Sequence, residues 1–548
     1  MQDEWGISDG YEDVHGAWHA TSDQARARLR AAMGDPQPGP PMLFVREGES
    51  RRIPGRHELR LEDGSVSNIV DELPGHVPIG YHDLRPLDGS PEVRLVVHPE
   101  RCAAMPKEWG VAVQVYELWS DRSWGIGDLR DVRSLAESVL ARGGRALLLS
   151  PLHQPVPLLG QDPSPYYPST RRAWSPLLLS MDAPPPEHLR CHPGELIDRD
   201  EVWISKRAAL EAEFDAGVGD VEPGSIAHFN ALCDVLGADW RAWRSEDLTD
   251  DQRAEVDERA RFHEWLQHKF AAQLEEVRAT GVQLIGDLAV GFAPSGADAH
   301  DFRDLLAMDM RIGAPPDEFN TEGQNWGILP FAPWRVRAAR YEPFIRTVRA
   351  VLRGMDGLRM DHVMGLFRQY WVPEGGTPHD GAYVRYRSDE LLAILAIEAT
   401  RAGAFVVGED LGTVEPAVHE AMARFGIAGT KVLWFEDDPP SRWPEQSLAT
   451  VTTHDLPTLR AVFAHVQEGD LDDPMARRLA KVTVGIDDPD EAVRVTHAAL
   501  LESPSRLRLL SADDLAGATD QPNVPCSETH PNWRLRLPVP VDQIMDGL

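Results

Sequence analysis

The sequence is poor in cysteine, in long apolar runs and in positive charge. Its four cysteines, Cys102, Cys191, Cys233 and Cys526, are far apart in 548 residues, so neither a disulfide framework nor a cysteine metal site is expected. No apolar run of about 18 residues occurs, which argues against a membrane-spanning helix. The first ten residues, "MQDEWGISDG", are acidic and lack the apolar core of a signal peptide. We therefore expect a cytoplasmic protein.

Acidic residues outnumber basic ones by 88 to 55, a formal net charge of −33. A chain this acidic is repelled by nucleic acid and by anionic membrane surfaces, so neither is expected as a partner. Uncharged substrates such as sugars fit better, although the acidity could also serve solubility alone. The phosphate-binding pattern G-x-x-x-x-G-K-[ST] and the zinc pattern H-E-x-x-H are absent, and His153, His362 and His454 are too scattered to suggest a metal site. No cofactor or metal is expected.

Residues 1–105 predict an N-terminal helix followed by a small β-rich module. The stretch "SDQARARLRAAMG" begins at Ser22, a good N-cap, and ends at Gly34, a good helix stop. From Met42 to about Cys102 the pattern changes to short alternating stretches. The pairs Asp63-Gly64 and Asp88-Gly89 are typical of hairpin turns.

Residues 106–548 have a different sequence pattern, in which short apolar runs alternate with helical segments. The eight runs are 111–118, 145–150, 282–290, 357–363, 404–411, 429–435, 448–455 and, less clearly, 506–511. Short buried strands that alternate with helices indicate a parallel sheet. Eight of them indicate an α/β fold, a (β/α)8 TIM barrel; an open doubly wound sheet is the alternative. The segment 151–280 predicts an inserted helical subdomain, which either only stacks on the barrel or also walls its active site.

Several predicted strands end in ionisable side chains: Asp287; Asp361; Glu409 with Asp410; and His454 with Asp455. The carboxyl ends of barrel strands form the active-site face, so these groups are expected on one face. Any single acid there could instead cap a helix or serve a loop. Four such strand ends favour a functional interpretation.

Two carboxylates facing each other across a neutral substrate suit glycosyl transfer. One attacks the anomeric carbon or stabilises an oxocarbenium-like state, while the other protonates the leaving oxygen. Arg359, two residues before Asp361, points to the same side of its strand and would keep that acid ionised. The aromatic residues Trp326 and Tyr166, in loops after predicted strands, are candidate sugar contacts.

Seven longer motifs resemble one family. They are "SWGIGDL", "SPYYPSTRRAWSPLLL", "GAPPDEFNTEGQNWGILPF", "LRMDHVMGLFRQYWVPEG", "VVGEDLGTVEPAV", "TTHDLPT" and "QPNVPCSETHPNWRLR". In this order, between about Val111 and Arg534, they resemble the amylomaltases, the bacterial 4-α-glucanotransferases of glycoside hydrolase family 77. The N-terminal stretch "GYEDVHGAWHATSDQARARLRAAMG" resembles the extension of the longer members.

The resemblance implies a (β/α)8 barrel, a retaining double displacement and α-1,4-glucan substrates, namely maltooligosaccharides and, as further candidates, glycogen or starch breakdown products. It implies that Asp361 is the nucleophile, Glu409 the general acid/base and Asp455 the acid that stabilises the transition state. Substrate-binding roles fall to the remaining matched positions: Arg359, His454, Asp287, Tyr166, Gln324, Trp326 and Asn523.

The sequence also departs from the family pattern. Cys526 stands where the family has glycine, and Gly296 and His300 stand where many relatives have serine and tryptophan. These changes concern details of the subsites, since all three acids are present. Two alternatives remain from the sequence: an α-1,4-glucan hydrolase, in which water replaces the acceptor, and a catalytically silent glucan-binding protein.

Overall fold

The computed structural model describes the chain except for residues 1, 14, 38, 218, 220, 245–247, 317–320 and 413. Four residues of the motif "GAPPDEFNTEGQNWGILPF" therefore lie outside the described part. The chain forms two compact units, each assembled from segments that are distant in sequence. The first unit is Met1–Ala104, Phe302–Arg353 and Met360–Ile427; the second is Met105–Asp301, Gly354–Arg359 and Ala428–Leu548.

Eight strands make one sheet, in the order β18-β15-β12-β9-β8-β21-β20-β19. Each strand overlaps one of the eight runs predicted from the sequence. Their bounds are β8 Glu108–Val113, β9 Ala146–Leu149, β12 Gln283–Leu288, β15 Gly357–Met360, β18 Phe405–Gly408, β19 Gly429–Val432, β20 Ser447–Thr450 and β21 Leu507–Ser511.

The first and last barrel strands along the chain, β8 and β21, are neighbours in the sheet, and that pairing identifies a barrel. Strand β8 pairs in parallel with both β9 and β21, so that Val111 lies opposite Leu147 on one side and Leu510 on the other. An open doubly wound sheet would leave the first strand away from the last. The (β/α)8 prediction is therefore confirmed, and the doubly wound alternative is wrong.

The barrel strands are short, and most of their residues are buried. Strand β9 is "ALLL" and β18 is "FVVG", runs of the kind that parallel sheets covered by helices require. Glycine is required at position 110 in β8 for a steric reason, because a Cβ there would lie 1.8 Å from the carbonyl oxygen of Ala146.

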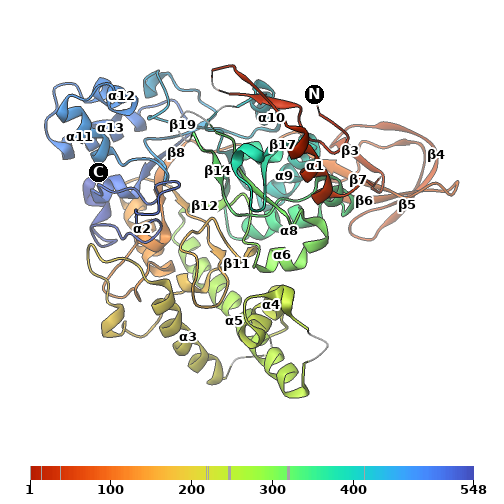
Figure 1. The fold of residues 1–548 in the computed structure, drawn as a ribbon, viewed down its shortest axis with the longest axis horizontal. Helices are drawn as coiled ribbons and strands as arrows, with labels where there is room; N and C mark the ends of the chain where they lie inside the picture. Colours follow the sequence, from red (N-terminus) through yellow and green to blue (C-terminus); the bar gives the residue numbers. More distant parts are fainter. Residues whose placement is uncertain are drawn as a thin grey trace. The chain divides into compact units, whose positions relative to one another are not determined.

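Helices make up much of the second unit, and three of them, α3, α4 and α5, lie together between β11 and β12 along the chain (Figure 1). Their bounds are α2 Leu129–Ala141, α3 Arg199–Asp215, α4 Ser225–Leu236, α5 Asp250–Arg278, α6 Ala297–Asp301, α11 Leu459–Glu468, α12 Pro474–Val482, α13 Pro489–Leu501 and α14 Ala512–Ala516. Helices α3, α4 and α5 occupy the segment expected to be helical. Helix α5 begins at a capping box, in which the Thr249 side chain accepts from the backbone N–H of Gln252.

A two-stranded sheet carries the first long loop of the second unit. Strands β10 (His153–Gln154) and β11 (Thr170–Trp174) pair antiparallel, with Pro155–Ser169 between them. That loop contains Tyr166, one of the predicted substrate contacts.

The first unit begins with the predicted helix and β-rich segment. Helix α1 (Asp23–Met33) has Ser22 as its N-cap and Gly34 at its end, as expected. The five-stranded sheet has the order β3-β7-β6-β4-β5. Its strands are β3 Met42–Arg46, β4 Arg51–Arg60, β5 Val66–Leu73, β6 Gly80–Pro86 and β7 Val93–His98. Both predicted hairpins are present, β4–β5 around Asp63-Gly64 and β6–β7 around Asp88-Gly89.

The described residues in the rest of the first unit form two further sheets and four α-helices. One sheet has the order β14-β13-β16-β17, and the other is the hairpin β1-β2. The bounds are β1 Gly10–Glu12, β2 Trp18–Ala20, β13 Met310–Ala314, β14 Gln324–Asn325, β16 Arg368–Pro373, β17 Ala382–Arg385, α7 Pro333–Ala338, α8 Glu342–Val351, α9 Ser388–Ala402 and α10 Pro416–Phe425. Among the helices described, none combines the length and apolar character needed to cross a bilayer.

Candidate active site

Two predicted site residues of the second unit form a buried ion pair at the ends of neighbouring strands. Asp287 is the penultimate residue of β12, and Arg359 is the penultimate residue of β15. Nη1 of Arg359 donates to both carboxylate oxygens of Asp287, at 2.7 and 2.8 Å. Arg359 and Asp287 are only 8% and 5% exposed, so removal of either would deprive the other buried charge of this partner.

Tyr166 joins this ion pair to His454. Its hydroxyl donates to Oδ2 of Asp287 at 2.7 Å and lies 3.3 Å from Nδ1 of His454. The two rings are stacked, with centroids 4.7 Å apart and planes 26° apart. The loop between β10 and β11 therefore brings a phenol onto the strand-end acid, and both contacts lock its orientation.

Asp455 is held from two sides. Its Oδ2 lies 3.4 Å from Nε2 of His454, and its Oδ1 accepts from Nδ2 of Asn523 at 2.6 Å. Burial alone would raise the pKa of this carboxyl, but the charge and hydrogen bond of His454, the Asn523 amide and Arg359 together lower it below the ordinary value. The side chain is still 44% exposed, so an ionised carboxylate is accessible to a ligand.

Trp533 lies at the centre of this aromatic group and was not singled out from the sequence. Its ring is 5.4 Å from those of both Tyr166 and His454, and 6.5 Å from that of Tyr116. Its backbone has a φ of 61°, in the left-handed region that a bulky residue rarely occupies. The motif "QPNVPCSETHPNWRLR" contained Trp533, but only the structure places it against residues that precede it by up to about 400 positions.

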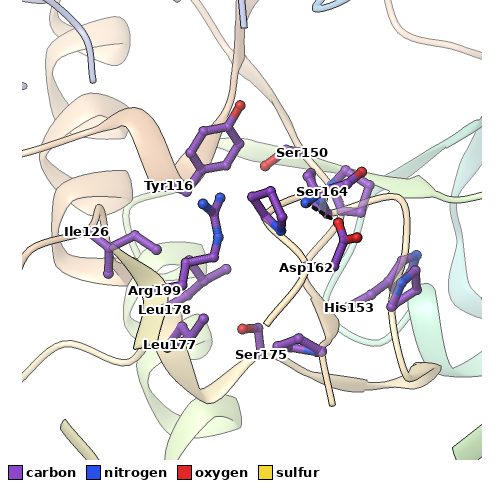
Figure 2. A pocket seen from close by; sticks show the side chains of 15 residues that line it. Tyr116, Ile126, Ser150, His153, Asp162, Ser164, Ser175, Leu177, Leu178 and Arg199 are labelled. Atoms are coloured by element: carbon purple, nitrogen blue, oxygen red, sulfur yellow. Dashed lines mark hydrogen bonds between the residues drawn. The ribbon is translucent and has the colours of Figure 1, made fainter. Parts of the chain in front are cut away.

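A small cavity of about 40 Å³ lies beneath the Tyr166 loop (Figure 2). One wall is the loop itself, in which the Asp162 carboxylate accepts from the backbone N–H of Ser164 at 2.9 Å. Another wall is the buried pair Arg199 and Tyr116, with the guanidinium 4.9 Å from the ring centre. A cavity of this volume accommodates ordered water rather than a whole sugar ring.

In the first unit, the backbone on both sides of Asp361 is clamped to Glu409. The Glu409 N–H donates to the Met360 carbonyl at 2.9 Å, and the Val363 N–H donates to the Glu409 carbonyl at 2.9 Å. Asp361 follows β15, and Glu409 follows β18. The two acids are thus presented from strand ends whose separation is fixed by backbone hydrogen bonds.

The Glu409 carboxyl is itself oriented by backbone amides. Its Oε2 accepts from the N–H of His362 at 3.0 Å, and its Oε1 accepts from the N–H of Leu411 at 2.6 Å. The preceding residue, Gly408, is closely packed, since a Cβ there would lie 2.9 Å from the side chains of Met422 and Val363. A carboxyl fixed in this way can transfer a proton along a defined direction.

His362 connects Asp361 to the predicted sugar-contact loop. It has a φ of 44°, and burial together with the Arg368 charge lowers its pKa to about 4, so it is neutral at pH 7. The ring of Trp326 meets it edge-on at 5.2 Å, and Nε1 of Trp326 donates to Oε1 of Gln324 at 2.8 Å. Two predicted substrate contacts, Trp326 and Gln324, therefore contact each other beside the residue that follows Asp361.

The departures from the family pattern have local explanations. Cys526 has a φ of 63°, so the backbone keeps the left-handed conformation that glycine favours. Gly296 is packed so closely that a Cβ would lie 2.3 Å from the carbonyl oxygen of Ser169. His300 lies 5.4, 5.5 and 5.8 Å from the rings of Phe229, Trp240 and Trp243, in an aromatic cluster of the helical segment.

The predicted site residues thus form two connected groups, one in each unit. In the second unit Asp287, Arg359, Tyr166, His454, Asp455 and Asn523 form one continuous network. In the first unit Glu409 holds the residues flanking Asp361, and Trp326 with Gln324 meets His362. The structure pairs Arg359 with Asp287, and its action on Asp361 stays a prediction.

A parallel (β/α)8 barrel with paired carboxylates at its strand ends is the architecture of a barrel enzyme and suits chemistry at glycosidic bonds. The model of glycoside hydrolase family 77, described as 4-alpha-glucanotransferase, matches residues 113–541. A 4-alpha-glucanotransferase of Mycobacterium tuberculosis (strain H37Rv) is 34% identical, over 96% of this chain and 89% of its own length. One of Haemophilus influenzae is 33% identical, over 76% and 70% respectively.

Solved structures agree with these matches. The amylomaltase from Corynebacterium glutamicum aligns with a TM-score of 0.83 at 28% identity, over 99% of this chain and 96% of its own. The amylomaltase from Streptococcus agalactiae, in complex with acarbose, aligns with a TM-score of 0.66 at 18% identity, over 78% and 95%, which supports the fold. The chain belongs to glycoside hydrolase family 77, the 4-α-glucanotransferase or amylomaltase family.

Proposed function

We propose that the chain transfers α-1,4-glucan segments between maltodextrins by a retaining double displacement. Family membership supports the reaction class. The observation that carries the assignment of residues is the clamp between Glu409 and the residues on either side of Asp361. Two carboxyl groups held at neighbouring strand ends are what a two-step glycosyl transfer needs.

In the first step, Asp361 attacks the anomeric carbon of the glucan donor as Glu409 gives its proton to the glycosidic oxygen. The bond between the anomeric carbon and that oxygen breaks. The released glucan takes the proton from Glu409, and the donor portion becomes covalently joined to Asp361 with inverted configuration. Glu409 is left as a carboxylate, the form that the two backbone N–H groups stabilise.

In the second step, Glu409 acts as a base. It takes the proton from the 4-hydroxyl of an acceptor glucan, and that oxygen attacks the anomeric carbon. The bond to Asp361 breaks, the α configuration is restored and both acids return to their starting states.

The second-unit network supplies binding groups. Asp455, ionised and accessible, accepts hydrogen bonds from sugar hydroxyls and stabilises the positive charge of the transition state. His454 and Asn523 orient it. The Arg359–Asp287 pair and Tyr166 form the remaining polar wall for the sugar. Trp326 and Gln324 contact the glucan from their own loop.

The substrates proposed are maltooligosaccharides, with glycogen or starch breakdown products as further sources. A cytoplasmic location fits the thiols of Cys102, Cys191 and Cys233, which lie buried in a form that a reducing compartment preserves. We also retain a division into an N-terminal module, 1–105, and a catalytic barrel, 106–548, with the helical insertion at 151–280. The oligomeric state is left open.

Purified protein incubated with maltotriose alone tests the function. Glucose together with maltodextrins longer than maltotriose is the expected product set, because transfer lengthens one molecule as it shortens another. Glucose and maltose with nothing longer would identify the hydrolase alternative. Folded protein that binds maltotriose without turnover would identify a silent glucan-binding protein.

A further inference from the structure

The first unit contains a cavity of about 330 Å³ that the reaction does not use. Its size is typical of small-molecule sites. The N-terminal segment forms one side, and strands β16 and β17 with the start of α10 form the other. The lining residues are Ser8, Gly10, Tyr11, Glu12, Asp13, Trp18, Arg368, Arg385, Val414, Glu415 and Pro416.

The N-terminal segment is firmly docked on this sheet. The N–H of Arg385 donates to the Gly6 carbonyl at 2.8 Å, and the N–H of Ser8 donates to the Tyr383 carbonyl at 2.9 Å. Ile7 between them is fully buried in a cluster with Leu29, Met33 and Trp371. The cavity is therefore a built feature of the unit, and its two sides are held together by strand pairing and an apolar core.

Aromatic groups line the N-terminal side. Trp18 is 56% exposed, an unusual degree for a tryptophan. Its ring lies over Gly10, where a Cβ would come within 2.6 Å of the indole, so a glycine is needed for the ring to lie down on the hairpin. Tyr11 stacks on His19 at 5.0 Å and meets Tyr383 edge-on at 5.6 Å. An indole supported from below and open above offers a flat apolar platform.

The charged groups of the opposite side are arranged as pairs. Glu415 accepts from Arg385 at 2.8 Å and lies 2.7 Å from Nη1 of Arg368. The Arg368 guanidinium also lies 4.1 Å from the ring centre of Tyr383, which fixes its plane. Two arginines and three acids line the cavity, so the net charge of the lining is 2 − 3 = −1. Such a lining offers many hydrogen-bond groups but little attraction for an anion.

We propose that this cavity is an accessory glucan site, which binds a non-reacting stretch of an α-1,4-glucan chain. Its chemistry suits a neutral, hydroxyl-rich ligand: an apolar platform for a pyranose face beside fixed carboxylates and guanidiniums for hydroxyl groups. The inference rests on the proposed function for the identity of the ligand.

The covalent chain limits how far this site lies from the acid/base. Glu415 follows Glu409 by six residues, and an extended chain of that length spans at most about 22 Å. In this proposal a long glucan chain occupies the accessory site and the reacting site together, whereas one maltotriose molecule fills only one of them. The site would therefore favour long substrates.

Steady-state kinetics with two substrates test the proposal. The measured quantity is the ratio of kcat/KM for a long-chain soluble maltodextrin to kcat/KM for maltotriose. Trp18→Ala is expected to lower this ratio about tenfold, the loss that one buried aromatic face produces, and Trp18→Phe should restore part of it. Val70→Ala is the matched control, since Val70 is a 59% exposed apolar residue of β5 that does not line the cavity.

A direct binding measurement makes the result independent of turnover. Calorimetric titration of the Asp361→Ala protein with maltotriose, which fills the two sites independently, should show two sites, and addition of Trp18→Ala should remove one of them. A single site that Trp18→Ala leaves unchanged, together with an unchanged kinetic ratio, would overturn the accessory site. Far-UV circular dichroism of Trp18→Ala and Trp18→Phe establishes that the hairpin change has not unfolded the chain.

The proposed function and the accessory site are tested by different results. Wild-type protein that does not lengthen maltotriose contradicts the transferase assignment, whatever the state of Trp18. Active protein in which Trp18→Ala leaves both the kinetic ratio and the number of sites unchanged contradicts only the accessory site.

Discussion

Nη1 of Arg359 contacts both carboxylate oxygens of Asp287, and the hydroxyl of Tyr166 donates to the same carboxylate. The buried Asp287 carboxylate therefore accepts hydrogen bonds from one guanidinium and one phenol hydroxyl. Loss of either side chain would remove this buried contact between opposite charges, so the pair is a strong determinant of local structure.

We expect the Arg359–Asp287 pair to be strongly coupled in stability. Asp287→Ala and Arg359→Ala should each lower the free energy of unfolding by about 3 kcal/mol, because each leaves a buried charge without its partner. The double variant should lose much less than the sum, which urea denaturation of all four proteins would measure. The exposed pair Arg442 and Asp438, 73% and 66% exposed, is the control and should show a coupling of less than about 1 kcal/mol. Additive losses at Asp287 and Arg359 would contradict the coupling.

Trp533 is expected to position Tyr166 and His454 for the reaction. Trp533→Ala removes the ring that both contact, so kcat should fall about 10- to 100-fold, the effect that small misplacements of site groups can have. Trp533→Phe, which keeps an aromatic ring, should show a smaller fall in kcat. The measurement is kcat and KM for maltotriose. A change confined to stability, with kcat intact in the folded fraction, would mean that Trp533 only fills space.

Cys526 should be replaceable by glycine with a gain in stability. Its φ of 63° costs a residue with a Cβ about 1 kcal/mol, and glycine avoids most of that cost. Cys526→Gly should therefore raise the free energy of unfolding by up to about 1 kcal/mol, whereas Cys526→Ala, which keeps a Cβ, should leave it nearly unchanged. Thermal unfolding compares the three proteins. Equal effects of glycine and alanine would show that the thiol, not the backbone, is responsible.

His362 should make stability fall in mild acid. Its pKa in the folded protein, about 4, is below the ordinary 6.5, so the unfolded chain binds its proton first as the pH falls. The contribution is fully present at pH 7 and is lost progressively between about pH 6.5 and 4, roughly 2 kcal/mol of it by pH 5. His153 and His497, whose pKa values are lowered to about 3 and 4, act in the same direction.

The variant that isolates this contribution is His362→Asn, since asparagine tolerates the left-handed backbone at this position. The loss of unfolding free energy between pH 7 and pH 5 should be smaller in His362→Asn than in the wild type by that amount. Identical pH dependence in the two proteins would show that His362 is protonated equally in the folded and unfolded states.

The sequence predicts the strands of the barrel well because each is a short apolar run bounded by glycine or by ionisable residues. The strand bounds are less well predicted. The run 111–118 predicts one strand, but β8 ends at Val113. The Val115 N–H donates to Oγ of Ser150, and a short 3-10 helix, Val115–Glu117, buries Tyr116 and Glu117. A side-chain hydrogen bond from another strand end is invisible to a local pattern.

The candidate acids are also predictable, since a carboxylate after a buried strand is a local signal. The residues that contact these acids cannot be predicted from the local sequence. The spacing of Arg359 and Asp361 predicts an interaction between these two, which stays a prediction. No local pattern indicates that the guanidinium binds Asp287, on a strand 72 residues earlier in the chain. Trp533 and the accessory cavity were missed for the same reason, because both depend on contacts between segments distant in sequence.

The most direct test of the account is the site of the covalent intermediate. Glu409→Gln protein should be incubated with α-maltotriosyl fluoride, whose leaving group needs no proton from Glu409, and then digested and examined by mass spectrometry. The account predicts a maltotriosyl adduct on the peptide that contains Asp361, which accumulates because the base for the second step is missing. An adduct on any other residue, or rapid turnover with no adduct, would contradict the assignment of Asp361 as nucleophile and Glu409 as acid/base.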